Sequence, residues 1–251
     1  MQPDTAQALE SAARLGALIR PALVALLLSG LWLALGRAQL ALRQRALAFS
    51  AAGAFLIAWL AGVWMLALHG AFARILGARP AAGAILVAEV ALVAIALSLL
   101  VRSRSIAAAL DAAPAWWLVA FQGYRVTGLV FLQLWVAGIL PASFAVPAGA
   151  GDTLIGIASL GTVIAFWRNS PRARTLALGV NLLGIADLLC ALALGAASGA
   201  GASPLLGYPL VLVPTFGVPL ALMIHGLSLW QLQRQSRSLH SVAVPSPPQR
   251  A

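Results

Sequence analysis

Four charged side chains lie inside long apolar segments of this 251-residue chain: Glu89, Arg125, Asp152 and Asp187. A charge at the centre of a bilayer costs about 2.5 to 3.5 kcal/mol on insertion scales, so such a group normally faces a cavity or a partner. Counted at about 1.5 Å per helical residue, the four lie about 15 to 22 Å from one membrane face and share a layer. Arg125 therefore either forms a packing ion pair with Asp187 or Glu89, or binds an anionic headgroup or carboxylate.

Three uncharged polar side chains, Gln122, Asn181 and His225, form a shallower layer about 9 to 10 Å from the same face. Gln122 precedes Arg125 by three residues, so the two share one face of a helix. The two layers are close enough in depth to line one cavity. The candidate binding site therefore consists of Arg125, Asp152, Asp187, Glu89, Gln122, Asn181 and His225.

The segment 140–156, LPASFAVPAGAGDTLIG, combines two prolines with glycines directly before Asp152. It predicts either a partly unwound helix start, which directs backbone N–H groups at a ligand, or an ordinary turn with Asp152 as the helix N-cap. A second pair of prolines, Pro214 and Pro219, flanks Gly217 and predicts a kink in the last apolar segment.

The residues expected of several enzyme and cofactor classes are missing. The 16 basic residues are all arginine, so no lysine can form a Schiff base with retinal or another aldehyde. Cys190 is the single cysteine, and the histidines 69, 225 and 240 do not share a depth that would allow bis-histidine haem. No HExxH or CxxC spacing occurs. We therefore predict no metal and no cofactor, and a non-enzymatic role over an enzymatic one.

The composition indicates an integral membrane protein, since 62% of the residues are hydrophobic and 9% charged. Runs of about 20 apolar residues predict an all-α, polytopic bundle of about seven transmembrane helices. The tail 232–251, rich in Ser, Arg and Pro, is predicted to be disordered and basic, and residues 1–231 to form one domain. Residues 4–14 form an interfacial helix or extend the first helix. The predicted helices are 15–35, 46–68, 81–101, 115–140, 148–167, 175–197 and 209–231.

The arginines predict the orientation of this bundle. With the N-terminus outside, eleven arginines fall on the cytoplasmic side and four on the outer side, counted from the sequence. Short cytoplasmic loops collect positive charge, so the pattern favours N-outside, C-inside in a bacterial inner membrane. The net charge of +10 follows from these loops and does not predict nucleic-acid binding.

Two resemblances follow from these motifs. Gly149-Ala150-Gly151-Asp152 is similar to the GxGD motif of intramembrane aspartyl proteases, which implies a second catalytic Asp on an earlier helix, but Tyr124 is followed by Arg125 at that place. The segments 124–152, 181–187 and 213–225 together resemble a family of uncharacterised bacterial multi-pass membrane proteins. That family implies no particular activity.

Three functions fit these observations. The first is a small-molecule or ion/proton-coupled transporter with a polar site between the last four helices. The others are a structural or sensory membrane subunit acting through a partner chain, and a membrane-embedded lipid-modifying enzyme. The lipid bilayer is the expected partner, and an anionic small molecule, a lipid headgroup or a proton is the expected ligand; the oligomeric state stays open.

Overall fold

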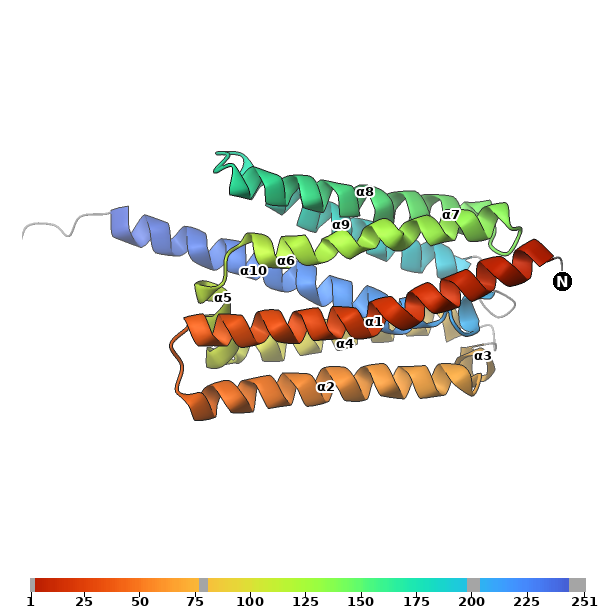
Figure 1. Cartoon of the computed structure of the whole chain (residues 1–251), viewed down its shortest axis with the longest axis horizontal. Helices are drawn as coiled ribbons and strands as arrows, with labels where there is room; N and C mark the ends of the chain where they lie inside the picture. The colour runs from red at the N-terminus through yellow and green to blue at the C-terminus, as the bar shows by residue number, and fades with distance from the viewer. Residues whose placement is uncertain (1–2, 77–80, 198–203, 244–251) are drawn as a thin grey trace, which may run out of the picture.

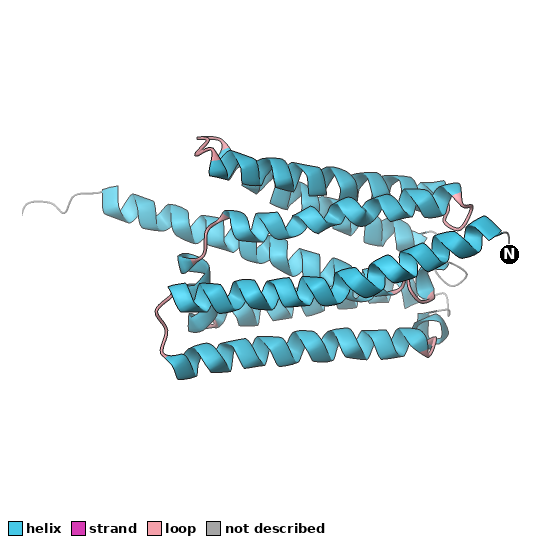
Figure 2. Ribbon diagram, viewed as in Figure 1, coloured by secondary structure: helices cyan, strands magenta, loops and turns pink. Residues whose placement is uncertain are grey.

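A computed structural model describes residues 3–76, 81–197 and 204–243, and the side chains of 5–74, 90–197 and 204–237. Within these ranges the chain is helical and contains no strand (Figure 2). The all-α fold predicted from the sequence is therefore confirmed. The elements are α1 (Pro3–Arg37), α2 (Leu42–Leu68), α3 (Ala71–Leu76), α4 (Ala81–Arg102), α5 (Arg104–Ala112), α6 (Trp116–Phe121), η1 (Gln122–Gly128), α7 (Leu129–Val136), α8 (Ala142–Trp167), α9 (Ala173–Ala197), η3 (Pro204–Leu206), η4 (Val213–Gly217) and α10 (Val218–Ala243).

The long helices run side by side as an elongated bundle (Figure 1). Helix α8 packs against α9 and against the η1–α7 segment, and α10 packs against α4, α6 and α9. Helix α1 contacts α2, α5 and α7. Helix α10 therefore lies between the α6–α9 group and the α1, α2 and α4 group.

Five helices among the described residues are long and apolar enough to cross a membrane: those beginning near Thr5, Leu42, Ala142, Ala173 and Val213. A sixth is possible if α4 and α5, which meet at an 81° bend, count as one span. The predicted fourth span, 115–140, is divided among α6, η1 and α7. It is therefore not one long helix and is not among these five. Several such helices in one chain indicate a multi-pass membrane protein. The number of seven transmembrane helices stays a prediction.

The side chains are distributed as a lipid environment requires. Large apolar residues face outward along several helices, for example Leu18, Val136, Leu154 and Leu183, each more than 60% exposed. Several polar side chains are instead fully buried between helices. In water this arrangement would leave a wide apolar surface exposed. In a bilayer the outward apolar side chains face lipid, and the polar side chains find their partners inside the bundle.

The arginine-rich loops gather at one end of the bundle. The α1–α2 and α8–α9 connections and the C-terminal end of α10 lie together, opposite the N-terminus (Figure 1). Two arginines there stack on tryptophan rings: Arg45 lies 3.6 Å from the ring centroid of Trp32, and Arg37 lies 4.6 Å from that of Trp117. Such pairs are typical of membrane interfaces, where the ring is half-buried and the cation is hydrated.

The predicted boundaries at the two ends of the chain need correction. Helix α1 starts at Pro3, so residues 4–14 extend the first helix. Helix α10 continues to Ala243, so 232–243 is helical where disorder was predicted. The physical reason is contact with other elements: Arg174 Nη2 donates to the carbonyl of Leu232 at 2.6 Å, and Gln235 Nε2 donates to that of Ala113 at 3.3 Å. Residues 244–251 of the predicted tail lie outside the described residues.

The proline- and glycine-rich segment before Asp152 is a regular helix. Helix α8 begins at Ala142 behind the extended Pro141 and includes Pro147. Both interpretations of this segment are therefore wrong, since Asp152 lies ten residues inside α8 and is neither at an unwound start nor an N-cap. A proline in the second turn removes only one backbone hydrogen bond, and the rest of the helix is intact.

The helical irregularities lie elsewhere, in η1 and η4. The π-helix Val213–Gly217 interrupts regular helix geometry where Pro214 and Gly217 predicted a kink. The 3₁₀ segment Gln122–Gly128 has no proline and was not predicted. In a 3₁₀ helix residues three apart lie above one another, so Gln122, Arg125 and Gly128 form one buried row.

Candidate functional site

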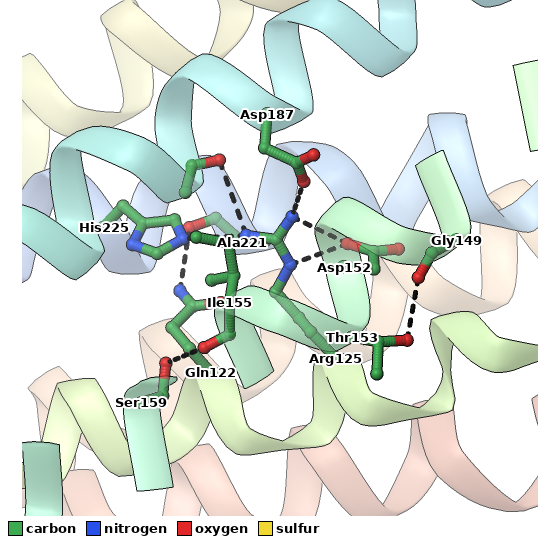
Figure 3. Close-up of polar contacts among 11 residues, drawn as sticks. Gln122, Arg125, Gly149, Asp152, Thr153, Ile155, Ser159, Asp187, Ala221 and His225 are labelled. Atoms are coloured by element: carbon green, nitrogen blue, oxygen red, sulfur yellow. Dashed lines mark hydrogen bonds and ion pairs between the residues drawn. The ribbon is translucent and has the colours of Figure 1, made fainter. Parts of the chain in front are cut away.

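Arg125 is the centre of a buried polar network (Figure 3). Its side chain is 1% exposed. Nε donates to Asp152 Oδ1 at 2.7 Å, and Nη2 lies at 2.7 Å from the same oxygen and donates to Asp187 Oδ2. Nη1 lies 3.4 Å from the carbonyl oxygen of Gly184 and 3.3 Å from His225 Nε2. The guanidinium thus joins α8, α9 and α10 through all three of its nitrogens.

The contacts of His225 define its tautomer. Arginine only donates, so Nε2 of His225 accepts from Arg125 and carries no proton. Nδ1 then carries the proton and donates to Asn181 Oδ1 at 2.9 Å. Asn181 Nδ2 in turn donates to the Ala177 carbonyl at 2.7 Å and to Ser228 Oγ at 2.9 Å. His225 is therefore a neutral acceptor for Arg125, held by a chain of hydrogen bonds between α9 and α10.

Gln122, one turn before Arg125 in η1, links this segment to α10. Its Nε2 donates to the Ala221 carbonyl of α10 at 3.2 Å, and the residue is completely buried. Because η4 precedes α10, the carbonyl of Ala221 lies in the first turn after the π-helix. Gln122 therefore fixes the 3₁₀ segment against the start of α10.

Glycines make room for the charged groups. A Cβ added to Gly151 would overlap Asp187 Oδ1, and one added to Gly184 would overlap the ring of His225 and lie 3.1 Å from Arg125 Nη1. These positions therefore need hydrogen as the side chain if the carboxylate and imidazole are to reach the guanidinium. The glycine before Asp152 in the sequence thus serves the other aspartate of the site.

The same rule brings η1 close to α8. A Cβ on Gly156 would lie 2.6 Å from the backbone nitrogen of Val126, and one on Gly128 would overlap Asp152. At Gly156 the backbone of α8 meets the backbone of η1, and at Gly128 the backbone of η1 meets the side chain of Asp152, as glycine allows. This close packing holds Arg125 and Asp152 in register.

The charges of the network are unequal. Asp152 and Asp187 both contact Arg125, and their side chains are 20% and 18% exposed. With both carboxylates ionised, the three residues carry one net negative charge. An unbalanced charge is costly at low dielectric, so one proton or one cation would neutralise the group.

A cavity of about 100 Å³ adjoins this network. Arg125 and Asp152 line one side of it, and α1 contributes Leu15, Ile19 and Arg20 on the other. The remaining walls are mainly apolar. A small site therefore lies between α1 and the network, with polar groups on opposite walls.

Six of the seven predicted site residues lie in this one network: Arg125, Asp152, Asp187, Gln122, Asn181 and His225. Arg125 contacts both aspartates at once, where the sequence left its partner open between Asp187 and Glu89. The side chain of Glu89 lies outside the described residues. Two residues at the site were not predicted, Ser228 and Arg20. Ser228 has no distinguishing spacing, and Arg20 was counted among the four outer arginines.

The described residues contain no group of three or more His, Cys, Asp or Glu side chains that could hold a metal ion. Cys190 is a free thiol exposed on the outside of α9. The polar groups of the Arg125 network are one arginine, two carboxylates, one neutral imidazole, two side-chain amides and the hydroxyl of Ser228.

The fold and its buried charges define a multi-pass membrane protein of unknown function. The chain belongs to a family described as a domain of unknown function, DUF8737, which matches residues 80–233. No curated protein and no solved structure matches it. The expected membership in an uncharacterised family is thus confirmed. The match spans α4 to most of α10 and includes the whole Arg125 network, whereas α1 and α2 precede it.

Proposed function

We propose that this protein is a proton-coupled carrier for a small solute, and that the Arg125 network holds the coupling proton. The observation that carries the proposal is the sharing of one buried arginine by two aspartates. One carboxylate suffices to neutralise Arg125. The second is free to bind and release a proton, because either aspartate can satisfy the arginine while the other is neutral.

Access to the network supports this role. Arg125 is enclosed, but both carboxylates keep partial exposure, and Asp152 also lines the cavity toward α1. A proton can therefore reach a carboxylate without the arginine leaving its place. The charge that the proton neutralises is the one that the low dielectric penalises most.

The irregular helices beside the site support movement. Arg125 lies in the 3₁₀ segment η1, and η4 precedes the part of α10 that carries His225. Broken helices at membrane depth are where carriers place substrate and ion sites, since the freed backbone groups face a cavity. A proton that binds to the network therefore binds beside η1 and η4, the two irregular segments that can change shape.

The proposal includes the topology. The chain crosses a bacterial inner membrane seven times, with the N-terminus outside and the arginine-rich end in the cytoplasm. The excess of arginine in one set of loops supports this orientation, and the gathering of these loops at one end agrees with it.

The test is proton movement in proteoliposomes that contain a pH-sensitive dye. The small-molecule fraction of a bacterial lysate, adjusted to the internal pH, is added outside while the membrane potential is clamped. Wild type is expected to acidify the lumen faster than protein-free liposomes. Asp187→Asn and Asp152→Asn are expected to fall to the protein-free rate, because neither variant keeps a spare carboxylate.

The control is Asp111→Asn, which removes a half-exposed ion pair with Arg234 far from the network. It is expected to behave as wild type. Equal acidification by wild type and Asp187→Asn, or none by wild type, would overturn the proposal.

A further inference from the structure

A second buried arginine, Arg20 of α1, lies outside the Arg125 network. It is 9% exposed, and its Nη1 is buried without a hydrogen-bond partner among the described residues. Arg20 lines the cavity that Arg125 and Asp152 line from the other side. An unsatisfied guanidinium nitrogen in an apolar setting is costly unless an acceptor occupies the site.

The backbone of α1 is adapted to this placement. A Cβ on Gly16, one turn before Arg20, would overlap Nη1 of Arg20. The guanidinium therefore lies back along its own helix over a glycine and is directed into the bundle. Arg14, one and a half turns earlier, is exposed and paired with Glu10 at 2.6 Å. The two arginines of one helix thus differ in environment, and only Arg20 faces the cavity.

We propose that the cavity binds a small organic monocarboxylate, with its carboxylate on Arg20 and its apolar part against the cavity wall. The volume sets the size: a cavity of about 150 Å³ takes one benzene, which has six carbon atoms, so about 100 Å³ takes roughly four non-hydrogen atoms. Leu15, Ile19, Phe131 and Phe216 supply an apolar wall that inorganic anions do not need. One guanidinium with a nitrogen left unsatisfied by the described residues matches one carboxylate.

The charge balance links this anion to the proton, and in this respect the inference rests on the proposed function. The Arg125 network carries one net negative charge when both of its aspartates are ionised, and in the empty cavity the positive charge of Arg20 faces it. A carboxylate on Arg20 neutralises that positive charge and leaves the ionised Asp152 on the wall of the same cavity. The bound anion therefore favours the protonated network, so the anion and the proton bind together.

The experiment measures binding without transport. Purified wild-type protein in nanodiscs of zwitterionic lipid is titrated calorimetrically with acetate and propionate, and separately with phosphate and chloride. Wild type is expected to bind the carboxylates, more tightly as the pH falls, and to bind phosphate and chloride at least about tenfold more weakly. Arg20→Gln is expected to lose about tenfold or more in carboxylate affinity, while Arg14→Gln binds as wild type.

Arg20→Lys keeps the charge and shows whether the site survives if Arg20→Gln does not fold; it is expected to retain measurable binding. Absence of carboxylate binding by wild type, equal binding of phosphate, or equal affinity in the Arg20→Gln variant would overturn the inference. So would stabilisation of the protein by anionic lipid alone, since a headgroup would then be the ligand. None of these results alters the proton measurement with Asp187→Asn, so the two proposals fail separately.

Discussion

At the scale of single residues, the central feature is an arginine that serves two carboxylates and an imidazole at once. The types of these residues and their depth were predictable, because charges in apolar helices are few and must meet one another. The pairing was not predictable, since the depth count gave Glu89 and Asp187 as equal partners for Arg125. Only the close contact of η1 with α8, which depends on glycine packing, brings Asp152 to the guanidinium.

Loss of the arginine should cost more than loss of either carboxylate. Arg125→Gln leaves two partly buried carboxylates without a cation, and we expect up to about 3 kcal/mol of lost stability. Asp152→Asn keeps a neutral pair of Arg125 with Asp187 and should cost clearly less. Thermal unfolding of the purified variants in one detergent checks the order.

The surface pair supplies the comparison for this measurement. Arg234 and Asp111 are 38% and 43% exposed, and such a pair is worth about 0 to 1 kcal/mol. Asp111→Asn should therefore hardly change the melting temperature. If Arg125→Gln has the same melting temperature as Asp111→Asn, Arg125 does not hold the bundle together.

At the scale of elements, proline marked a break correctly in one of two segments, and the break that packing makes had no signal in the sequence. The π-helix at Val213–Gly217 contains Pro214 and was predicted as a kink. The segment before Asp152 also contains prolines, yet α8 is regular because Pro147 lies near its start. The 3₁₀ segment η1 has no local signal and is stabilised by contacts with α8 that lie far away in the sequence.

Glycine substitutions test these contacts within single helices. Gly151→Ala in α8 and Gly184→Ala in α9 should displace Asp187 and His225 and lower the melting temperature. Gly161 and Gly179 of the same helices have no atom within 4 Å of an added Cβ. Alanine there should be neutral or stabilising by up to about 1 kcal/mol. Equal effects in both pairs would contradict the close packing.

The C-terminal part of α10 should also contribute to stability. A chain ending after Gln231 loses the acceptors Leu232 and Ser236 of Arg174, and the contact of Gln235 with Ala113. Each such hydrogen bond is worth about 0.5 to 1.5 kcal/mol. We expect the chain ending after Gln231 to have a lower melting temperature than the full-length chain. The chain ending after Ala243 is expected to have the same melting temperature as the full-length chain. Identical melting temperatures of all three chains would show that residues 232–243 do not stabilise the bundle, as expected of a disordered tail.

At the scale of the whole molecule, composition was sufficient for the class of fold. A chain of 62% hydrophobic residues with polar groups at a few depths can satisfy its backbone in a bilayer only as helices or a closed barrel, and the 20-residue apolar runs select helices. The relative placement of helices could not be predicted, because the apolar surfaces of α1, α2 and α4 carry little to distinguish one neighbour from another.

The orientation can be measured with single cysteines. In a Cys190→Ala background, Asn169→Cys lies in the arginine-rich α8–α9 connection, and Gly138→Cys lies in the α7–α8 connection at the opposite end. An impermeant maleimide added to intact cells should label Gly138→Cys only, and both after lysis. The reverse pattern would invert the topology.

Asp152 and Asp187 are proposed to share one exchangeable proton, and infrared titration of the carboxylic acid C=O stretch measures that proton directly. In a Glu89→Gln background, the protein in membranes should show one buried carboxylic acid band that titrates with pH. Asp152→Asn and Asp187→Asn should each abolish it, because Arg125 keeps the remaining carboxylate ionised, and Asp111→Asn should leave it unchanged. A protein without such a band, or a band that survives in both network variants, would contradict the account.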